Sequence, residues 1–207
     1  EIQLIKKIIL KYKLGKLVSM NVVGGNAGFA MGGVHFIEIF NFLTKNKIFK
    51  VSSYLERKKT RNPRGKQFRD SSGQIIAKNK KNQTLYINLS CYQGHGTNIT
   101  YSFKNGNILV NKNGLLNVNI REKKYFNYPL NLHGLPEINK NYKFKKNNHV
   151  ETTATLLSNF LKNKNYPTGN GGVETIKTLV AIMESNKVSG QFKELSKTNI
   201  LKNYPWA

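Results

Sequence analysis

The 207-residue sequence is poor in cysteine and in acidic residues, and it has no long apolar run. Its single cysteine, Cys91, excludes a disulfide framework, and no group of His, Cys, Asp or Glu has the spacing of a metal site. We therefore expect a reducing, cytoplasmic compartment and no bound metal. No apolar run approaches the length of a membrane span, and no signal peptide with a small-residue cleavage site is visible. A membrane partner is accordingly not expected.

Acidic residues number 10 against 34 lysines and arginines, which gives a formal net charge of +24. Such an excess can indicate a nucleic-acid or anionic-membrane partner, because clustered cations neutralise phosphates. The lysines are scattered along the chain, however, and accompany abundant Asn and Ile, as in proteins encoded by AT-rich codons. Codon usage is therefore the preferred interpretation, and a surface that attracts anions is the alternative.

Hydrophobic residues make up 39% of the chain and aromatic residues 11%, which is enough for one hydrophobic core. No internal repeat or second domain is evident, so residues 1–207 are expected to form a single domain. Apolar spacing predicts helices over residues 2–13, 35–44, 150–162 and 173–185. Gly15 is suited to end the first helix in the left-handed conformation.

Alternating apolar residues predict a series of strands. Asn105-Gly106 and Asn113-Gly114 are typical of tight hairpins, so the segment from residue 73 to residue 121 is expected to form an antiparallel meander. The fold class is therefore α+β, a large, mostly antiparallel sheet with helices packed on one face. Residues 122–148 are basic and interrupted by prolines, and we expect them to cross the surface without regular structure. The predicted strands are 17–23, 48–55, 74–77, 84–93, 97–104, 107–111 and 115–121.

A glycine-rich loop from Gly24 to Gly33 leads directly into the helix that carries His35. Five glycines in ten residues allow a close approach of the backbone to a ligand, at an entropic cost that a simple linker need not bear. The apolar side of the helix would hold the imidazole rigidly. Imidazole titrates near neutral pH and is a natural acceptor for an alcohol proton. The alternative is a histidine that only satisfies backbone groups at a helix start.

Several weak motifs follow one another along the chain: Lys13-Leu14-Gly15-Lys16-Leu17, the glycine loop with His35, the meander, Tyr166-Pro167-Thr168-Gly169, Gly171-Gly172 and Met183-Glu184-Ser185. In this order they resemble the C-terminal domain of the glucose-fructose oxidoreductase / inositol 2-dehydrogenase (Gfo/Idh/MocA) family. The resemblance covers nearly the whole chain. It implies an enzyme in which a missing N-terminal Rossmann domain binds NAD or NADP, and in which residues 1–15 are the last helix of that domain or a link to it.

The same resemblance implies that His35 transfers a proton at the substrate hydroxyl. Family members carry an acid four positions before this histidine, whereas here Met31 occupies that position. Glu38, three residues after the histidine, also matches a common family acid and could orient the imidazole. The Gly-x-Gly-x-x-Gly fingerprint is absent, as is the family's Glu-Lys-Pro motif, so the chain alone is expected to bind no nucleotide tightly and to be inactive.

Three further residues are candidates for substrate binding. Asn26 could bind a sugar hydroxyl, or serve only as a turn residue. Arg64 lies with Arg61 and Lys66 in a long polar connection over residues 56–72. It could bind a carboxylate or a phosphate, or it could simply be exposed to solvent. His95 lies between two glycines and could line the same pocket.

The function expected from the resemblance is that of the substrate-binding and oligomerisation domain of an oxidoreductase for a sugar, polyol or nucleotide-sugar hydroxyl. The chain would form homo-oligomers through an exposed sheet face. One alternative is a non-catalytic basic module that binds a polyanion or nucleic acid. The other is an inactive family member that has kept the scaffold.

Overall fold

A computed structural model of the chain describes residues 2–25, 27–62, 65, 67–129, 137–144, 148–163 and 169–199. The helical segments are α1 (Ile2–Lys11), the π-helix η1 (Phe29–Gly33), α2 (Val34–Thr44), η2 (Lys123–Tyr125), α3 (His149–Leu161), α4 (Gly169–Lys187) and η3 (Leu195–Lys197). The strands are β1 (Leu17–Gly25), β2 (Ile48–Leu55), β3 (Thr60–Arg61), β4 (Arg69–Asp70), β5 (Gly73–Asn79), β6 (Thr84–Ser90), β7 (Asn98–Phe103), β8 (Gly106–Val110), β9 (Leu115–Arg121), β10 (Glu137–Lys143) and β11 (Lys193–Glu194).

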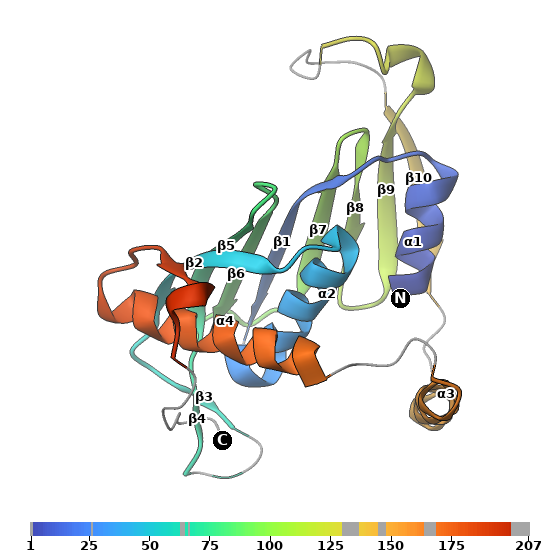
Figure 1. Cartoon of the computed structure of the whole chain (residues 1–207). Coiled ribbons are helices and arrows are strands. Elements are labelled where there is room, and N and C mark those ends of the chain that lie inside the picture. The colour runs from blue at the N-terminus through green and yellow to red at the C-terminus, as the bar shows by residue number, and fades with distance from the viewer. Residues whose placement is uncertain are drawn as a thin grey trace.

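One large sheet organises the described part of the chain (Figure 1). Its strands follow the order β10-β9-β8-β7-β1-β6-β5-β2-β11, and β3 and β4 form a separate small hairpin. Among the described pairs β1 and β6 run parallel, and the other neighbours are antiparallel. The predicted fold class, α+β with a large, mostly antiparallel sheet, is confirmed.

The expected uninterrupted meander is wrong at one point, because β1 lies between β6 and β7. Residues 91–97 separate these two strands, which is more than a tight hairpin needs. The gap between the strands is filled by β1, which pairs with β6 on one side and β7 on the other. The N-terminal strand is therefore central in the sheet.

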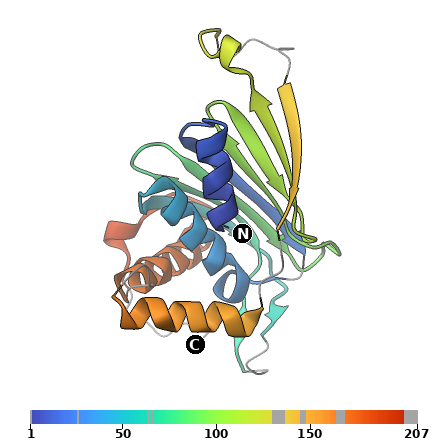
Figure 2. The ribbon, with the colours of Figure 1, turned by 90° about the vertical axis from the view of Figure 1, so that its right-hand side faces the viewer.

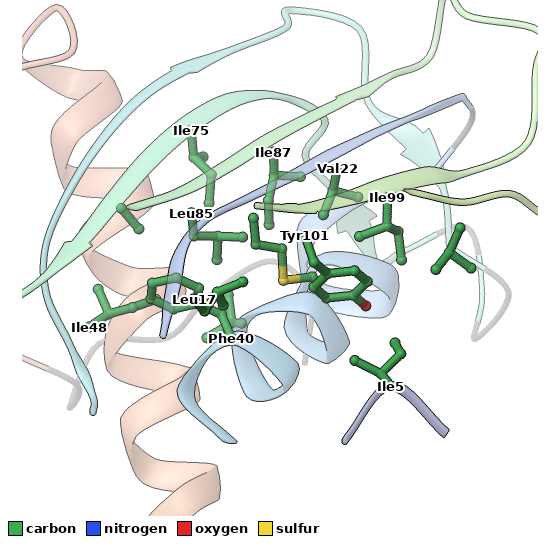
Figure 3. Close-up of a cluster of buried hydrophobic side chains, with 14 of the residues drawn as sticks. Ile5, Leu17, Val22, Phe40, Ile48, Ile75, Leu85, Ile87, Ile99 and Tyr101 are labelled. Carbon is green, nitrogen blue, oxygen red and sulfur yellow. The ribbon is translucent and has the colours of Figure 1, made fainter. Parts of the chain in front are cut away.

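The hydrophobic core lies between the helices and one sheet face. Strand residues alternate in burial, so that Met20 and Val22 of β1 face the same side as Leu85 and Ile87 of β6. Figure 3 shows Val22, Leu85 and Ile87 on the side of the sheet where Phe40 of α2 lies. Ile5 of α1, Leu17, Ile48, Ile75, Ile99 and Tyr101 belong to the same cluster.

Helices α1, α2 and α4 lie on one side of the sheet, as Figure 2 shows. The first helix ends at Lys11, two residues earlier than expected, and Gly15 is left-handed as predicted, with φ +84°. Helix α4 begins at Gly169, four residues earlier than expected, since glycine lowers helix propensity without preventing a first turn. None of the described helices is long and apolar enough to cross a membrane.

The opposite face of the sheet carries small polar side chains with a few large apolar ones. One row of cross-strand partners runs over seven strands of this face. Asn117 and Asn141 in this row are hydrogen-bonded to each other at 2.9 Å. The row consists of Ile76, Tyr86, Asn21, Thr100, Leu109, Asn117 and Asn141.

The expectation for residues 122–148 is wrong over part of that segment, where β10 forms an edge strand. Ile138 and Tyr142 of β10 pair with Ile120 and Leu116 of β9, so the two-residue alternation of the neighbouring strand continues. A hydroxyl–hydroxyl contact also joins Tyr142 to Tyr12, just after α1. The strand was missed because Asn and Lys occupy most of its positions.

Candidate functional site

The candidate site lies where the two parallel strands of the sheet end. In the β1–β6 register Gly25 is opposite Ser90, the last residue of each strand. The carboxyl ends of parallel strands meet at one edge, so the glycine loop that follows β1 emerges beside the segment that follows β6. The backbone amide of Gly25 donates to the carbonyl of His95 at 2.9 Å, which joins the two segments directly.

The glycines of this loop permit close packing against other parts of the chain. A Cβ atom at Gly25 would overlap the backbone carbonyl of Gln93, and one at Gly28 would overlap the carboxylate of Asp70. A Cβ at Gly33 would lie 2.7 Å from the ring of Phe29. The close approach inferred from the sequence is therefore real, but its partners are protein groups.

Asp70 is the internal partner of the loop. Its carboxylate accepts hydrogen bonds from the amides of Ala30 at 3.0 Å, Met31 at 2.9 Å and Ser71 at 2.8 Å, and the residue is 2% exposed. Because an ionised carboxylate accepts several backbone donors well, it holds the start of the π-helix in place. Single π-helical turns are frequent at functional sites.

His35 follows the π-helix as the second residue of α2. Its side chain is 70% exposed, and Nδ1 lies 4.0 Å from Oε2 of Glu38, one turn along the helix. This distance exceeds that of a hydrogen bond, so the carboxylate influences the imidazole through charge alone. The imidazole is thus accessible to a ligand, held by the backbone beneath it, and close to one acid.

Glu56 is a second carboxylate whose hydrogen bonds hold neighbouring segments together at the same edge of the sheet. Burial of its carboxylate opposes ionisation, but hydrogen bonds from Ser90, Cys91 and Ser72 outweigh this effect and lower the pKa of Glu56 to about 2. The Ser72 hydroxyl donates at 2.7 Å and the Cys91 amide at 3.0 Å. The neighbouring carboxylate in turn raises the pKa of the Cys91 thiol, so this cysteine is a poor nucleophile.

His95 shares this edge of the sheet with the glycine loop. Its Nδ1 atom lies 2.8 Å from the carbonyl of Gly96, and its side chain is exposed. The structure thus brings the segments of His35 and His95 together, although within the described residues the two imidazoles make no contact. Asn26 and Arg64 lie outside the described residues, so their roles stay predictions.

Asp70 and Glu56 were missed by sequence reasoning. Asp70 lies about 40 residues after the amides that it binds, and Glu56 lies 34 residues before Ser90. No local pattern connects such positions. The one available signal was Gly28, whose lack of a side chain is explained by the adjacent carboxylate.

The described residues contain no group of three or more His, Cys, Asp or Glu that could hold a metal ion. A cavity of about 450 Å³ lies at the other end of α2, between Lys45, Lys47, Phe49, Lys80 and Glu174. It is remote from His35, which begins the same helix. Around His35 the described chain therefore supplies an open surface.

No protein-family model and no curated protein sequence matches this chain. Solved structures do match. A putative NADPH-dependent oxidoreductase from Desulfitobacterium hafniense DCB-2 has a TM-score of 0.68 at 12% identity, over 94% of this chain and 61% of that one. The chain has the fold of Gfo/Idh/MocA-type oxidoreductases.

Two further structures share this Gfo/Idh/MocA-type fold. An oxidoreductase from Agrobacterium radiobacter, in complex with NAD+, L-tartaric acid and magnesium, has a TM-score of 0.63 at 13% identity, over 94% of this chain and 61% of that one. A super-repressor mutant of Gal80p from Saccharomyces cerevisiae has a TM-score of 0.64 at 11% identity, over 94% and 62%. At these identities the likeness establishes the fold. The chain spans about three fifths of the length of these proteins.

Proposed function

We propose that this chain is the substrate-binding and oligomerisation domain of an NAD(P)-dependent oxidoreductase that acts on a hydroxyl of a sugar, polyol or nucleotide sugar. The observation that carries the proposal is the fold, which oxidoreductases share over 94% of the chain. The accessible His35 at the end of the glycine loop supports it. So does the Agrobacterium neighbour, whose structure holds NAD+ together with a hydroxy acid.

In this proposal His35 accepts the proton of the substrate hydroxyl. Nδ1 is the nitrogen nearer to Glu38, so Nε2 is left for the substrate. The Glu38 carboxylate then stabilises the imidazolium that proton transfer produces, which replaces part of the effect of the acid missing at position 31. Positioned acid–base groups contribute about 10²- to 10⁴-fold to the rate.

The described hydrogen bonds of the glycine loop do not favour binding of a dinucleotide pyrophosphate. The amides of Gly25, Phe29 and residues 30–33 already donate to protein acceptors, so they are not available to phosphate oxygens. NAD or NADP would instead be bound mainly by sequence outside these 207 residues. The chain on its own would be inactive.

The test is turnover by the protein expressed from its complete gene, on a panel of sugars, polyols and nucleotide sugars with NAD and with NADP. His35→Ala should lower kcat about 10²-fold or more, because it removes the proton acceptor. Glu38→Gln should have a smaller effect. Lys16→Ala, an exposed residue at the far end of β1, serves as the control. Equal rates for wild type and His35→Ala would exclude His35 from the chemistry.

An inactive regulator is the second candidate function. Two observations favour it: Met31 replaces the expected acid, and a mutant of the repressor Gal80p shares the fold. Failure of the whole panel with both nucleotides, by a protein that still binds one of them, would support this candidate over the enzyme.

A further inference from the structure

The arginines of this chain are concentrated in one segment. Five of the 34 basic residues are arginines, and four of these five lie between residues 57 and 69. No acidic residue lies in that range. A bias toward AT-rich codons explains scattered lysines, but it does not explain arginines gathered in one place. Arginine is the side chain that binds carboxylates and phosphates through two parallel hydrogen bonds.

The structure places Arg57, Lys58 and Lys59 directly before β3 and Arg69 on β4, whose Asp70 binds the start of the π-helix η1 at the candidate site. Arg57, Lys58, Lys59 and Arg69 are exposed. The register of the hairpin pairs Arg61 with Arg69.

The carboxylates of the two acids next to these cations already accept several hydrogen bonds within the protein. Glu56 accepts from Ser72, Ser90 and the Cys91 amide, and Asp70 accepts three backbone amides. Across the described part of the chain, none of the four exposed cations forms an ion pair. None of these four charges is therefore neutralised by a described acid, which leaves them able to attract an anionic ligand.

The hairpin is connected to the segment that carries His35. Arg69 directly precedes Asp70, whose carboxylate binds the amide of Met31, one helical turn before His35. Lys59 donates to the Ser71 hydroxyl at 3.0 Å. Lys58 lies over the ring of Tyr92, 5.5 Å from its centroid, on the loop that leads to His95. The cations thus border the surface where a substrate would meet the imidazole.

We infer that the substrate carries an anionic group, a carboxylate or a phosphate, and that Arg57, Lys58, Lys59 and Arg69 bind it. This inference rests on the proposed function, since it names the substrate class of the same site. The hydroxyl to be deprotonated would face His35 while the anionic group is held at the hairpin. Neutral polyols would lack this second anchor and bind more weakly.

The test measures binding by calorimetry, without turnover, to the protein expressed from its complete gene. The probes are D-glucose, D-glucuronate and D-glucose 6-phosphate, so that the neutral, carboxylate and phosphate forms of one sugar are compared. We expect at least one anionic probe to bind about tenfold or more tightly than glucose at low salt, with affinity falling as sodium chloride is raised. Whichever anionic probe binds more tightly identifies the source of the charge.

The variant Arg57→Gln/Arg69→Gln should lose about tenfold or more in that affinity. The control variant Lys16→Gln/Lys81→Gln removes the same charge at the opposite end of β1 and β6. Its affinity for the anionic probe should stay within about twofold of the wild-type value. As a readout independent of variants, the bound anion should slow hydrogen exchange of the amides in β3 and β4. The inference is overturned if no anionic probe binds better than glucose, or if both double variants lose affinity equally.

These outcomes are separable from those of the proposed function. Tight binding of an anionic sugar by a protein that oxidises none of the panel would support the hairpin site and contradict the enzyme. Oxidation of a neutral polyol, together with no tighter binding of the anionic probes, would support the enzyme and contradict the hairpin site.

Discussion

At Glu56 three hydrogen-bond donors surround one carboxylate. Because these donors favour the charged form more than burial disfavours it, the pKa of Glu56 is about 2, against an ordinary value of 4.5. A group with a lowered pKa stabilises the native state above the pKa of the unfolded chain. This contribution is lost as the pH falls from about 4.5 toward 2.

Glu56→Gln should therefore lower the stability of the protein at pH 7, and the difference from wild type should shrink as the pH falls below about 4.5. The measurement is the urea midpoint of unfolding at intervals from pH 7 to pH 3. Glu151→Gln, at an exposed position on α3, is the matched control and should change little at any pH. A difference for Glu56→Gln that is constant over this range would contradict the assigned pKa.

The roles of individual residues could be predicted from the sequence to different extents. His35 could be found because the glycine loop and the apolar spacing of α2 are both local patterns. Asp70 could not, since its role depends on amides that are distant in sequence and reach it only in the folded chain. The arginines of residues 57–69 are visible in the sequence, but their connection to His35 through Asp70 is not.

At the scale of elements, the segment that leads into α2 depends on the side chain of one distant residue, Asp70. The π-helix η1 has no side-chain cap of its own, and the Asp70 carboxylate takes that role for Ala30 and Met31. Gly28 leaves the space that this carboxylate needs. The glycine loop, η1 and β4 thus behave as one structural unit.

Gly28→Ala should destabilise the protein by about 1–3 kcal/mol, because the new methyl group displaces Asp70 and its hydrogen bonds are lost. Urea denaturation at pH 7 measures the free energy of unfolding. Gly94→Ala is the control, since a Cβ there would meet no described atom within 4 Å. If the two variants are equally stable, the loop is not packed against Asp70 in this way.

Local periodicity predicted the elements better than their pairing. Strands such as β6 and β9 have strict alternation and were located within a few residues. Both failures concern partners: β1 enters the sheet between β6 and β7, and β10 pairs with β9 although its own sequence is polar. Pairing depends on the burial that a neighbour offers, and a single segment does not contain that information.

At the scale of the whole molecule, the described helices α1, α2 and α4 cover one sheet face, and no described helix covers the other (Figure 2). The open face combines Asn and Thr with large apolar residues, among them Tyr86 and Leu109. We propose that two copies of the protein associate through it, since exposed large apolar side chains on a sheet face are stabilised by burial against a second copy.

Tyr86→Lys/Leu109→Lys should then convert the oligomer into monomers, because it places charge in the centre of the contact. Light scattering after size-exclusion chromatography gives the mass. Leu10→Lys/Phe42→Lys adds the same charge on the helical side and should leave the mass unchanged. A monomeric wild-type protein, or dissociation of both variants, would contradict this interface.

The central place of β1 has a consequence for synthesis. Met20 pairs with Leu85 on one side and with Tyr101 on the other, so both neighbours of β1 are encoded far downstream. At roughly 5–20 residues per second, a ribosome needs about 4 to 16 seconds to make the intervening chain. During that time the backbone amides and carbonyls of β1 lack the two strands with which they pair in the folded protein. The middle of the sheet can close only once about half of the chain has been made.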